Sequence, residues 1–579
     1  MNSTSPWSRC ARVALVLAVV GSLASGCSDS SSSSAAPALR VGVAAIPITP
    51  CGANPEWDGP VTASGVWGEL YDDANGNGRY DVGETFTDDP RNDTLDAQSK
   101  GKYDGIYMAG FGADRVALGC HDDIWARAVV IDDGTTRLAI TAVDLVGTLK
   151  YGSYYGFKHA EQLVDPAFGV TNFIYASTHD HQGPDALGLW GTDTIVDGKF
   201  PLYLTFIDRQ VARAIGQAVA ALEPVREVRG FHTTPDESPE LRGLQVRTGC
   251  RPPFIFDTEL RALSFSGANG TIATVLNWGT HPESLEDGNQ LITSDFPGYI
   301  RDEVEQQVGG TAVYLSADLG AAEIVGDTCV GGADARNPDG SNEYDKRDEI
   351  GFPRTESIGR TVGGVAARGL LAAPTIEATT LDVRTASRRV AASNATFELA
   401  RSLGVLDLDA AIYDPAQCPG ATGLCGLFEQ TAVTLGDRAG KPQVQMITIP
   451  GELFPELYLG VAQNRRTDCP AADTGRPAEP SIRNAMTAPF RLVFGLSPDE
   501  LGYIVPGYDF YPAVIFDEAV DPCDGQHYDP AHPRRSVPTH YHESLSVGVE
   551  AASYATCTAV ELLQGSAAIA NEPACVGLP

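Results

Sequence analysis

Two strand-like segments of this chain lead directly into histidine residues. An apolar run over residues 172–177 is followed by T-H-D-H-Q-G-P at residues 178–184. A second apolar run over residues 272–278 is followed by G-T-H-P at residues 279–282. A side chain at the carboxyl end of a buried strand lies at the rim of a sheet, where ligands usually bind. We therefore expect the fold to hold His179, His181 and His281 at such a rim.

This pattern favours a metal site. In an extended H-x-H segment the two histidine side chains leave the same face, so both can reach one ion. Imidazole is a common zinc ligand, and catalytic zinc sites use three protein ligands plus water. The alternative is that these histidines cap strands and bond to backbone. With only ten histidines in 579 residues, three in such settings favour the metal interpretation.

Four motifs follow one another over roughly residues 40–565. The first is the segment at 178–184, and the second is N-W-G-T-H at 277–281 with T-S-D-F-P-G-Y at 293–299. The third is P-G-E at 450–452, and the fourth is G-Y-I-V-P-G-Y at 502–508. In this order they resemble T-H-T-H-S-G-P, N-W-F-x-V-H with S-S-D-x-x-G-Y, P-G-E and Y-V-T-T-x-E-E-Y of the neutral/alkaline (non-lysosomal) ceramidase family, in its amino-terminal catalytic domain.

The resemblance implies a zinc-dependent hydrolase that cleaves an N-acyl amide bond in a lipid or related amphiphile with metal-activated water. Carried over position by position, the implied zinc ligands are His179, His281, Glu452 and Tyr503. His181 is implied to stand beside the metal as a catalytic residue that donates a proton to the leaving amine. For Tyr503 the alternative is a core tyrosine, because phenolate is an uncommon zinc ligand.

The chain departs from the family pattern at one active-site position. The family carries G-D-V-S-P-N, whereas residues 315–323 here read L-S-A-D-L-G-A-A-E. Asp318 aligns with the family's aspartate, and Gly320 falls where its serine should be. Ser316, four residues upstream of Gly320, would not simply substitute on a strand. We therefore expect different substrate contacts and slow or absent hydrolysis of ceramide.

A second motif predicts a calcium site. Residues 73–84, D-A-N-G-N-G-R-Y-D-V-G-E, fit the calcium loop D-x-[DN]-x-[DN]-G-x5-E at every defined place. The ligands expected from the loop positions are Asp73, Asn75, Asn77, the backbone carbonyl of Arg79, Asp81 through water, and Glu84. Because helix-forming flanks are absent, we interpret the loop as a structural calcium site within an insertion at residues 52–107. The alternative is an acidic turn.

The amino terminus predicts export and lipid attachment. Arg9 and Arg12 precede a short apolar run, and L-A-S-G-C at residues 23–27 is typical of a bacterial lipobox. We expect a signal peptide over residues 1–26, acylation of Cys27 and a serine-rich tether over residues 27–39. This places the protein in the bacterial cell envelope, on the outer membrane or cell surface. An ordinary cleaved secretory signal is the alternative.

Charge and cysteine content agree with an extracytoplasmic protein. The formal net charge of −34 disfavours nucleic acid and charge-driven binding to anionic membrane. Ten of the twelve cysteines lie outside the signal peptide and position 27, which allows up to five disulfides. Cys418 and Cys425 are the local pair that we expect to form one. The family resemblance implies a lipid or other N-acyl substrate as a partner, and the lipobox implies the membrane that holds the lipid on Cys27.

The order of elements predicts the fold class. Strand-like runs at 137–145, 173–177, 273–278, 312–316 and 444–449 alternate with helical runs at 202–222, 298–307 and 356–371. Such alternation predicts an α/β fold with layers around a mixed sheet, over a single domain at residues 40–579.

Three further expectations concern the rest of the chain. After Glu543 only 36 residues remain, much of them one helix-like stretch at 544–564, so the family's carboxyl-terminal immunoglobulin-like domain is not expected. Residues 326–353 form either a lid or pocket wall, or a surface insertion without a catalytic role. Two functions stay open beside the amidohydrolase: a zinc hydrolase of other amides or esters, and a non-catalytic calcium-binding envelope protein that retains the fold.

Overall fold

The computed structural model describes residues 39–193, 196–244, 246–248, 255–324, 350–418, 425–461, 475–510 and 541–578. All of them belong to one unit of the chain, Pro37–Pro579. The predicted signal peptide, Cys27, nearly all of the tether and most of the segment 326–353 lie outside the described residues. Within the described ranges, no helix combines the length and the apolar character needed to span a bilayer.

Three mixed sheets form the framework, and all three repeat one arrangement of strands. The first has the order β7-β6-β5-β1-β8, the second β14-β12-β11-β9-β16 and the third β17-β18-β19-β21. In each sheet three successive strands pair antiparallel and a fourth pairs parallel to the third, as β6 with β7, β12 with β14 and β19 with β21. The prediction of one mixed sheet was therefore too simple, although the α/β class is confirmed.

The strands of the three sheets have the following bounds. The first sheet contains β1 (Arg40–Pro47), β5 (Trp125–Asp132), β6 (Arg137–Val143), β7 (Asn172–Ser177) and β8 (Glu223–Pro224). The second contains β9 (Glu227–Thr233), β11 (Leu260–Ser266), β12 (Thr271–Trp278), β14 (Thr311–Ser316) and β16 (Thr375–Ile376). The third contains β17 (Thr380–Ala391), β18 (Cys425–Gly436), β19 (Pro442–Thr448) and β21 (Phe490–Phe494).

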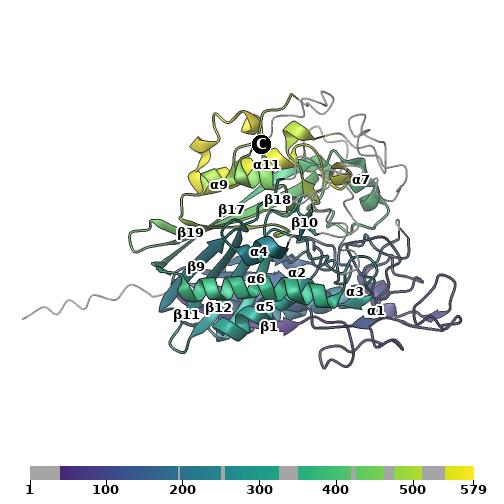
Figure 1. Ribbon diagram of the computed structural model, residues 1–579. Helices are drawn as coiled ribbons and strands as arrows, with labels where there is room; N and C mark the ends of the chain where they lie inside the picture. Colours follow the sequence, from purple (N-terminus) through teal and green to yellow (C-terminus); the bar gives the residue numbers. More distant parts are fainter. Residues whose placement is uncertain are drawn as a thin grey trace, which may run out of the picture. The chain divides into compact units, whose positions relative to one another are not determined.

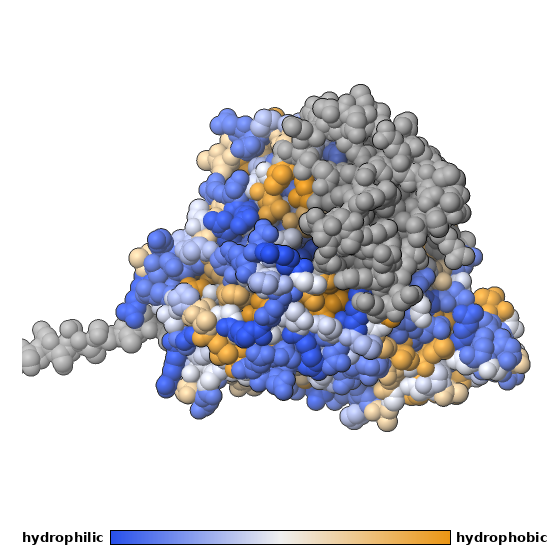
Figure 2. All heavy atoms as spheres, in the orientation of Figure 1, coloured by the Kyte–Doolittle hydropathy of each residue, from blue (hydrophilic) through white to orange (hydrophobic). Residues whose placement is uncertain are grey.

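Helices cover one face of each sheet. On the first sheet α3 (Pro201–Ala220) packs against β1 and β5, and α2 (Phe157–Leu163) packs against α3. On the second, α5 (Asp295–Val308) contacts β14 and α6 (Phe352–Ala372) contacts β9 and β11, whereas α11 (Ala551–Gln564) covers β17 and β18 of the third (Figure 1). On the face seen in Figure 2, hydrophilic residues predominate around scattered apolar ones, as the acidic composition requires.

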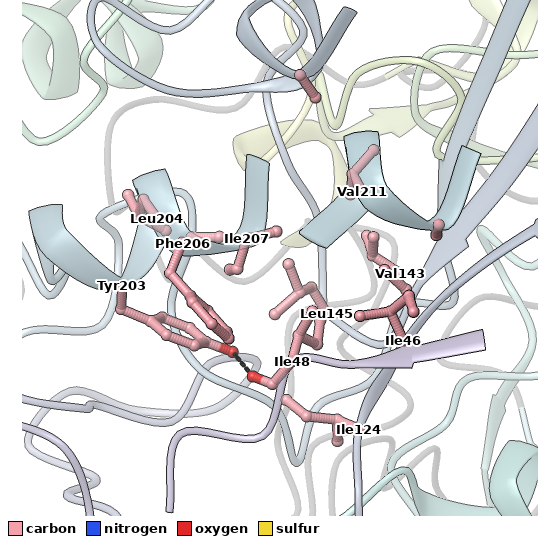
Figure 3. Packing of buried hydrophobic residues seen from close by; sticks show 14 of the residues in the cluster. Ile46, Ile48, Ile124, Val143, Leu145, Tyr203, Leu204, Phe206, Ile207 and Val211 are labelled. Atoms are coloured by element: carbon pink, nitrogen blue, oxygen red, sulfur yellow. Dashed lines mark hydrogen bonds between the residues drawn. The ribbon is translucent and has the colours of Figure 1, made fainter. Parts of the chain in front are cut away.

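Burial on both faces explains why the central strands are so apolar. In β5 every residue after Trp125 is buried. One face of the first sheet packs on α3, whose Phe206, Ile207 and Val211 belong to one buried cluster with Val143 and with Ile48 (Figure 3). Tyr203 of α3 donates a hydrogen bond from its hydroxyl to the carbonyl oxygen of Ile48 at 2.7 Å, so its polar atom is satisfied inside this core.

The other faces of the three sheets meet in a shared core. Val129 of the first sheet, Val313 of the second and Met446 of the third belong to one buried apolar cluster. Strands with no wetted face need a continuous apolar sequence rather than an alternating one. This shared core brings the carboxyl ends of the parallel strands of all three sheets toward one region.

Shorter elements connect the sheets. They are β2 (Leu70–Tyr71), β3 (Phe86–Thr87), α1 (Pro90–Leu95), β4 (Gly119–Cys120), α4 (Pro239–Leu244), β10 (Arg247–Thr248), β13 (Leu291–Ile292), β15 (Glu323–Ile324), α7 (Ala395–Ser402), β20 (Glu452–Leu453), α8 (Pro455–Leu459), α9 (Ile482–Ala485), β22 (Tyr503–Ile504) and α10 (Tyr541–Ser544). Of these strands, β20 and β22 pair in parallel, with Glu452 opposite Tyr503.

The predicted strands and helices are confirmed to within a few residues, with one exception. The helix-like stretch at 544–564 is interrupted between Ser544, the last residue of α10, and Ala551, where α11 begins; Gly548 in this gap adopts a φ of 141° that a helix does not contain. The predicted disulfide between Cys418 and Cys425 is present. Two further disulfides join Cys51 to Cys120 and Cys557 to Cys575. The remaining cysteines after position 27 lie outside the described residues.

Candidate metal centre

Strand ends from all three sheets carry the predicted metal ligands. His179 follows β7 of the first sheet, His281 follows β12 of the second and Glu452 follows β19 of the third. All three are buried, with exposed fractions of 3%, 0% and 6%. The Oε2 atom of Glu452 lies 3.4 Å from His179 Nε2 and 3.0 Å from His281 Nε2. The fold thus assembles residues that are far apart in the sequence.

Backbone carbonyls fix the orientation of both histidine rings. His179 Nδ1 lies 2.7 Å from the carbonyl oxygen of Val146, and His281 Nδ1 lies 3.1 Å from that of Ala322. Because a carbonyl can only accept, each Nδ1 must carry the proton and donate it. The Nε2 atoms then face the Glu452 carboxylate, which is the orientation that metal-binding histidines adopt toward a shared ion.

The electrostatics of this cluster favour a cation between its members. Burial alone would lower the pKa of His281, but Glu323 and Glu452 raise it to about 9. Burial alone would raise the pKa of Glu452, but His179 and His281 lower it to about 2. One nitrogen from each of His179, His181 and His281 also lies within 4.8 Å of the others. These buried groups could hold a metal ion.

His181 is held close to the other two histidines. Its ring centroid is 4.7 Å from that of His179, and neither of its ring nitrogens has a hydrogen-bond partner among the described residues. Burial, followed by the neighbouring histidines, lowers its pKa well below the usual value, so the ring is neutral at neutral pH. Gly110 packs on the ring so closely that a Cβ there would lie 2.4 Å from it.

The H-x-H segment is not extended, in contrast to the sequence prediction. Strand β7 ends at Ser177, and His179 has a φ of 66°, in the left-handed region. Arg115 holds the following backbone by donating to the carbonyl oxygen of His181 at 2.8 Å. Both imidazoles still reach one site. The turn at His179 brings them together, in place of the extended conformation expected from the sequence. Strained backbone of this kind persists where the surrounding structure enforces it, often at functional sites.

An apolar cavity of about 370 Å³ adjoins the histidines. His179, His181, Glu452 and Tyr503 line it together with mostly apolar side chains. The apolar side chains are Phe111, Val146, Leu187, Leu189, Trp190, Phe397, Leu399, Ala400, Leu403, Val405, Leu406 and Leu545. Tyr503 stands opposite Glu452 in the parallel pair of β20 and β22, and its ring packs against His542 with centroids 4.6 Å apart. All predicted residues of this centre therefore lie in one place.

Comparisons with known proteins agree with this geometry. No family model matches the chain. Over 229 residues, 37% of this chain, the sequence is 25% identical to a neutral ceramidase of Pseudomonas aeruginosa, and over 230 residues, 36% of this chain, it is 24% identical to one of Mycobacterium tuberculosis. The matched parts span only 33% and 34% of those relatives.

Solved structures extend the likeness to most of the fold. The crystal structure of the Pseudomonas aeruginosa neutral ceramidase matches with a TM-score of 0.51 and 16% identity, over 91% of this chain and 75% of that one. A structure described as ceramidase complexed with C2 matches over the same shares, with a TM-score of 0.50 and 15% identity. Neutral ceramidases are thus the proteins that this chain resembles, in sequence over 36–37% of its length and in fold over 91% of it.

Gly320, which the sequence resemblance aligns with the family's serine, leaves no room for a side chain. A Cβ on Gly320 would lie 2.4 Å from the carbonyl oxygen of Glu452, and the Gly320 N–H donates to the carbonyl oxygen of Leu453 at 3.0 Å. Ser316 is buried and donates its hydroxyl to the carbonyl oxygen of Thr178 at 2.7 Å. The absence of a side chain at 320 is thus part of how the Glu452 backbone is packed, and Ser316 is engaged elsewhere.

Three carboxylates near the ceramidase motifs were not predicted. Glu283 Oε2 lies 3.6 Å from His181 Nδ1, and Glu323 Oε2 lies 3.6 Å from His281 Nδ1, as carboxylates behind metal-binding histidines do. Glu500 follows β21 and lines the cavity beside His179. A polar residue close behind a buried strand was the signal used for the histidines, and it does not indicate Glu500, which comes six residues after the end of β21.

The loop at residues 73–84 folds around its own side-chain oxygens. Asp73 accepts hydrogen bonds from the backbone N–H groups of Gly76, Asn77 and Gly78 at 2.7, 3.0 and 2.8 Å. The two oxygens of Glu84 accept from the N–H groups of Ala74 and Asp81 at 2.9 and 3.0 Å.

The other side chains of this loop converge on Asp81. Its Oδ2 accepts from the amides of Asn75 and Asn77, each at 2.6 Å, and these bonds lower its pKa. The guanidinium of Arg79 lies 3.3 Å from the same carboxylate. The six predicted loop residues are thus gathered in one turn that lies mostly at the surface.

Proposed function

We propose that this chain is a zinc-dependent hydrolase that cleaves an N-acyl amide bond in a lipid or amphiphile. The observation that carries the proposal is the convergence of His179, His281 and Glu452 at one end of an apolar cavity, with both Nε2 atoms directed at one carboxylate oxygen. The relatives named neutral ceramidase support the same class of reaction.

The donor set fits zinc. Imidazole nitrogens and a carboxylate bind this ion at about 2.0–2.2 Å, so two ligands of one ion are at most about 4.4 Å apart. The distances of 3.0 and 3.4 Å between Glu452 and the two histidines satisfy that limit. We propose Tyr503 as a further ligand, because it stands opposite Glu452 in the paired strands. Zinc in such a site supplies hydroxide at neutral pH by lowering the pKa of water to about 7.

His181 is suited to move the proton of the reaction. It is neutral at neutral pH, so it can take the proton released from the attacking water and pass it to the leaving amine. Glu283 lies 3.6 Å behind its Nδ1, and burial together with Glu323 raises the pKa of that carboxyl. The close contact with Gly110 restricts the ring to one position.

The cavity indicates the class of substrate. Its volume of about 370 Å³ and its lining of leucine, valine and aromatic side chains suit an acyl chain. Polar groups are concentrated at the metal-binding end, where an amide would be cleaved. Because no side chain fits at Gly320, substrate contacts there differ from those of a serine-bearing ceramidase. The same position is the observation that favours the alternatives, a hydrolase of other amides or esters or a non-catalytic protein.

We propose further that the loop at residues 73–84 binds calcium and has a structural role. Its match to the calcium loop and the clustering of its oxygens support this role. Together with the lipobox at Cys27, such a loop suits an extracytoplasmic protein anchored in the cell envelope, where calcium is abundant.

The function is tested with metal analysis and a substrate panel. We expect about one zinc per chain in protein purified without chelator. Ceramide should be cleaved slowly or not at all, whereas a shorter N-acyl amine should be cleaved and a chelator should abolish that activity. Robust ceramide turnover would show that a glycine at position 320 does not prevent the cleavage of ceramide. Zinc-independent cleavage, or no cleavage across a panel of amides and esters, would reject the proposed function.

A further inference from the structure

Glu500 is held at the metal centre by a rigid segment. Its backbone N–H donates to the carbonyl oxygen of Thr148 at 3.0 Å. The preceding residue, Asp499, is fully buried and accepts from the N–H of Lys150 at 2.5 Å. Two consecutive residues are thus tied to the segment that follows β6, so the Glu500 side chain leaves the backbone from a fixed position.

The two carboxylate oxygens of Glu500 have different surroundings. Oε1 accepts a hydrogen bond from the N–H of Gly502 at 2.7 Å. Oε2 is buried and has no hydrogen-bond partner among the described residues. A buried carboxylate oxygen without a partner costs free energy unless something else satisfies it. The turn before β22 therefore accounts for one oxygen only.

The carboxylate of Glu500 lies beside the histidine cluster. One ligand atom from each of His179, Glu452 and Glu500 lies within 4.8 Å of the other two. Space for the side chain comes from Gly147, where a Cβ would lie 2.6 Å from the Glu500 Cβ. Gly147 directly follows Val146, whose carbonyl orients His179. The same short segment therefore positions the histidine and admits the carboxylate.

We propose that Glu500 is a second carboxylate ligand of the metal centre, beside Glu452. This inference rests on the proposed metal-dependent function and deepens it. Two carboxylates neutralise a divalent cation, whereas one leaves a net positive charge. The centre should therefore bind its ion more tightly than one with a single carboxylate, and oxygen-preferring divalent ions such as Mn²⁺ should compete better for it.

The test compares Glu500→Gln with the native chain and with Asp499→Asn as a matched control. Glutamine keeps the acceptor for Gly502 N–H but removes the charge. Asp499→Asn makes the same chemical change one residue away, in a side chain bonded to Lys150 rather than to the centre. Zinc affinity is measured by competition with a chromophoric chelator, and the visible spectrum of the Co²⁺-substituted protein reports the ligands.

We expect Glu500→Gln to weaken zinc binding by ~10-fold or more and to change the Co²⁺ spectrum. Asparagine keeps the acceptor for the Lys150 N–H that holds this segment, so Asp499→Asn should leave both unchanged. A second variant, Glu500→Asp, keeps the charge but withdraws the oxygens by one methylene, and it should also weaken zinc. Should Glu500→Gln misfold, the aspartate variant decides the question.

Two results would overturn the proposal, and they are distinguishable from each other. Native affinity and an unchanged spectrum in both Glu500 variants would show that Glu500 only holds the turn, while the metal centre itself stands. A native chain that binds neither zinc nor Co²⁺ would reject the metal-dependent function together with the role of Glu500.

Discussion

The two candidate metal-binding regions of this molecule are built in opposite ways. The centre around His179, His281 and Glu452 is buried, and 171 residues separate the last two. The loop at residues 73–84 is mostly exposed and takes all of its oxygens from one short stretch of chain. A change in the loop should therefore have local effects, whereas a change in the buried centre should affect three sheets.

The largest effect is expected from the histidines that lie between sheets. His281→Ala or His179→Ala should reduce zinc from about one per chain to nearly none after dialysis, because each removes one of few ligands. Metal analysis checks this, with His159→Ala in α2 as the control that removes an imidazole elsewhere. Full zinc retention by His281→Ala would contradict the centre described here.

His181→Ala tests whether His181 has a different role from His179 and His281. We expect zinc to remain and turnover to fall by ~10²–10⁴-fold, the usual loss when a proton-transfer group is removed. Steady-state kinetics beside metal analysis measure both. Loss of zinc in this variant, with retention in His179→Ala, would exchange the roles of the two histidines.

Gly320→Ser should damage the centre rather than restore ceramidase activity. The new Cβ would meet the Glu452 carbonyl, and overpacking of this kind costs about 1–3 kcal/mol. We expect a lower unfolding temperature and weaker zinc binding. Gly243→Ala is the control, since a Cβ on Gly243 in α4 meets nothing within 4 Å. A stable Gly320→Ser protein that gains ceramide turnover would refute this explanation of the glycine.

Glu84→Gln should act on the loop alone. Removing the expected bidentate carboxylate should abolish most of the rise in unfolding temperature that calcium gives the native chain. Zinc content and turnover should not change at temperatures where the protein is folded. Asp72→Asn removes one negative charge just outside the loop and is the control for charge alone. A fall in turnover of folded Glu84→Gln would connect the loop to the active site.

The smallest effect concerns a partly exposed ion pair that belongs to neither region. His232 Nδ1 lies 2.8 Å from Glu259, which raises the pKa of His232 above its ordinary 6.5. Burial alone would raise the pKa of Glu259, but His232 and Arg261 lower it to about 2. The contribution of His232 is complete below pH 6.5 and is lost as pH rises through its raised pKa. The contribution of Glu259 is complete above pH 4.5 and is lost as pH falls toward 2.

His232→Gln should therefore reduce stability between about pH 4.5 and 6.5 and have no effect in alkaline solution. Because the His232 side chain is 56% exposed, solvent screening limits the loss to about 0.2–1 kcal/mol. Urea unfolding at pH 5.5 and pH 9 measures the difference. Equal losses at both pH values would show that the ring contributes by packing rather than by charge.

The features that the sequence predicted well are those that depend on residues close together in the chain. Apolar runs before His179 and His281 predicted both the strands and the place of the histidines at their ends. The turn at His179 was missed because its φ of 66° is imposed by contacts such as that from Arg115, which is far away in sequence. Three sheets in place of one were missed for the same reason, since pairing between strands is not encoded in any single run.

The roles of Glu500 and Gly320 depend on packing between sheets. Glu500 reaches the centre because Gly147, in another sheet's loop, leaves room for it. Gly320 could be recognised as a departure from the family, but only the carbonyl of Glu452 explains why a side chain is excluded. The loop at 73–84 is the opposite case, because its hydrogen bonds all join residues within the motif itself.

A metal ion held by all three sheets would link their folding equilibria. A ligand that binds only the folded chain stabilises it in proportion to the logarithm of its free concentration, by about 4 kcal/mol at a thousandfold excess over Kd. That gain would be shared by the ends of β7, β12 and β19 at once. Chelators used during purification would then lower the stability of the whole molecule. Zinc uptake during refolding would indicate that the three sheets have assembled.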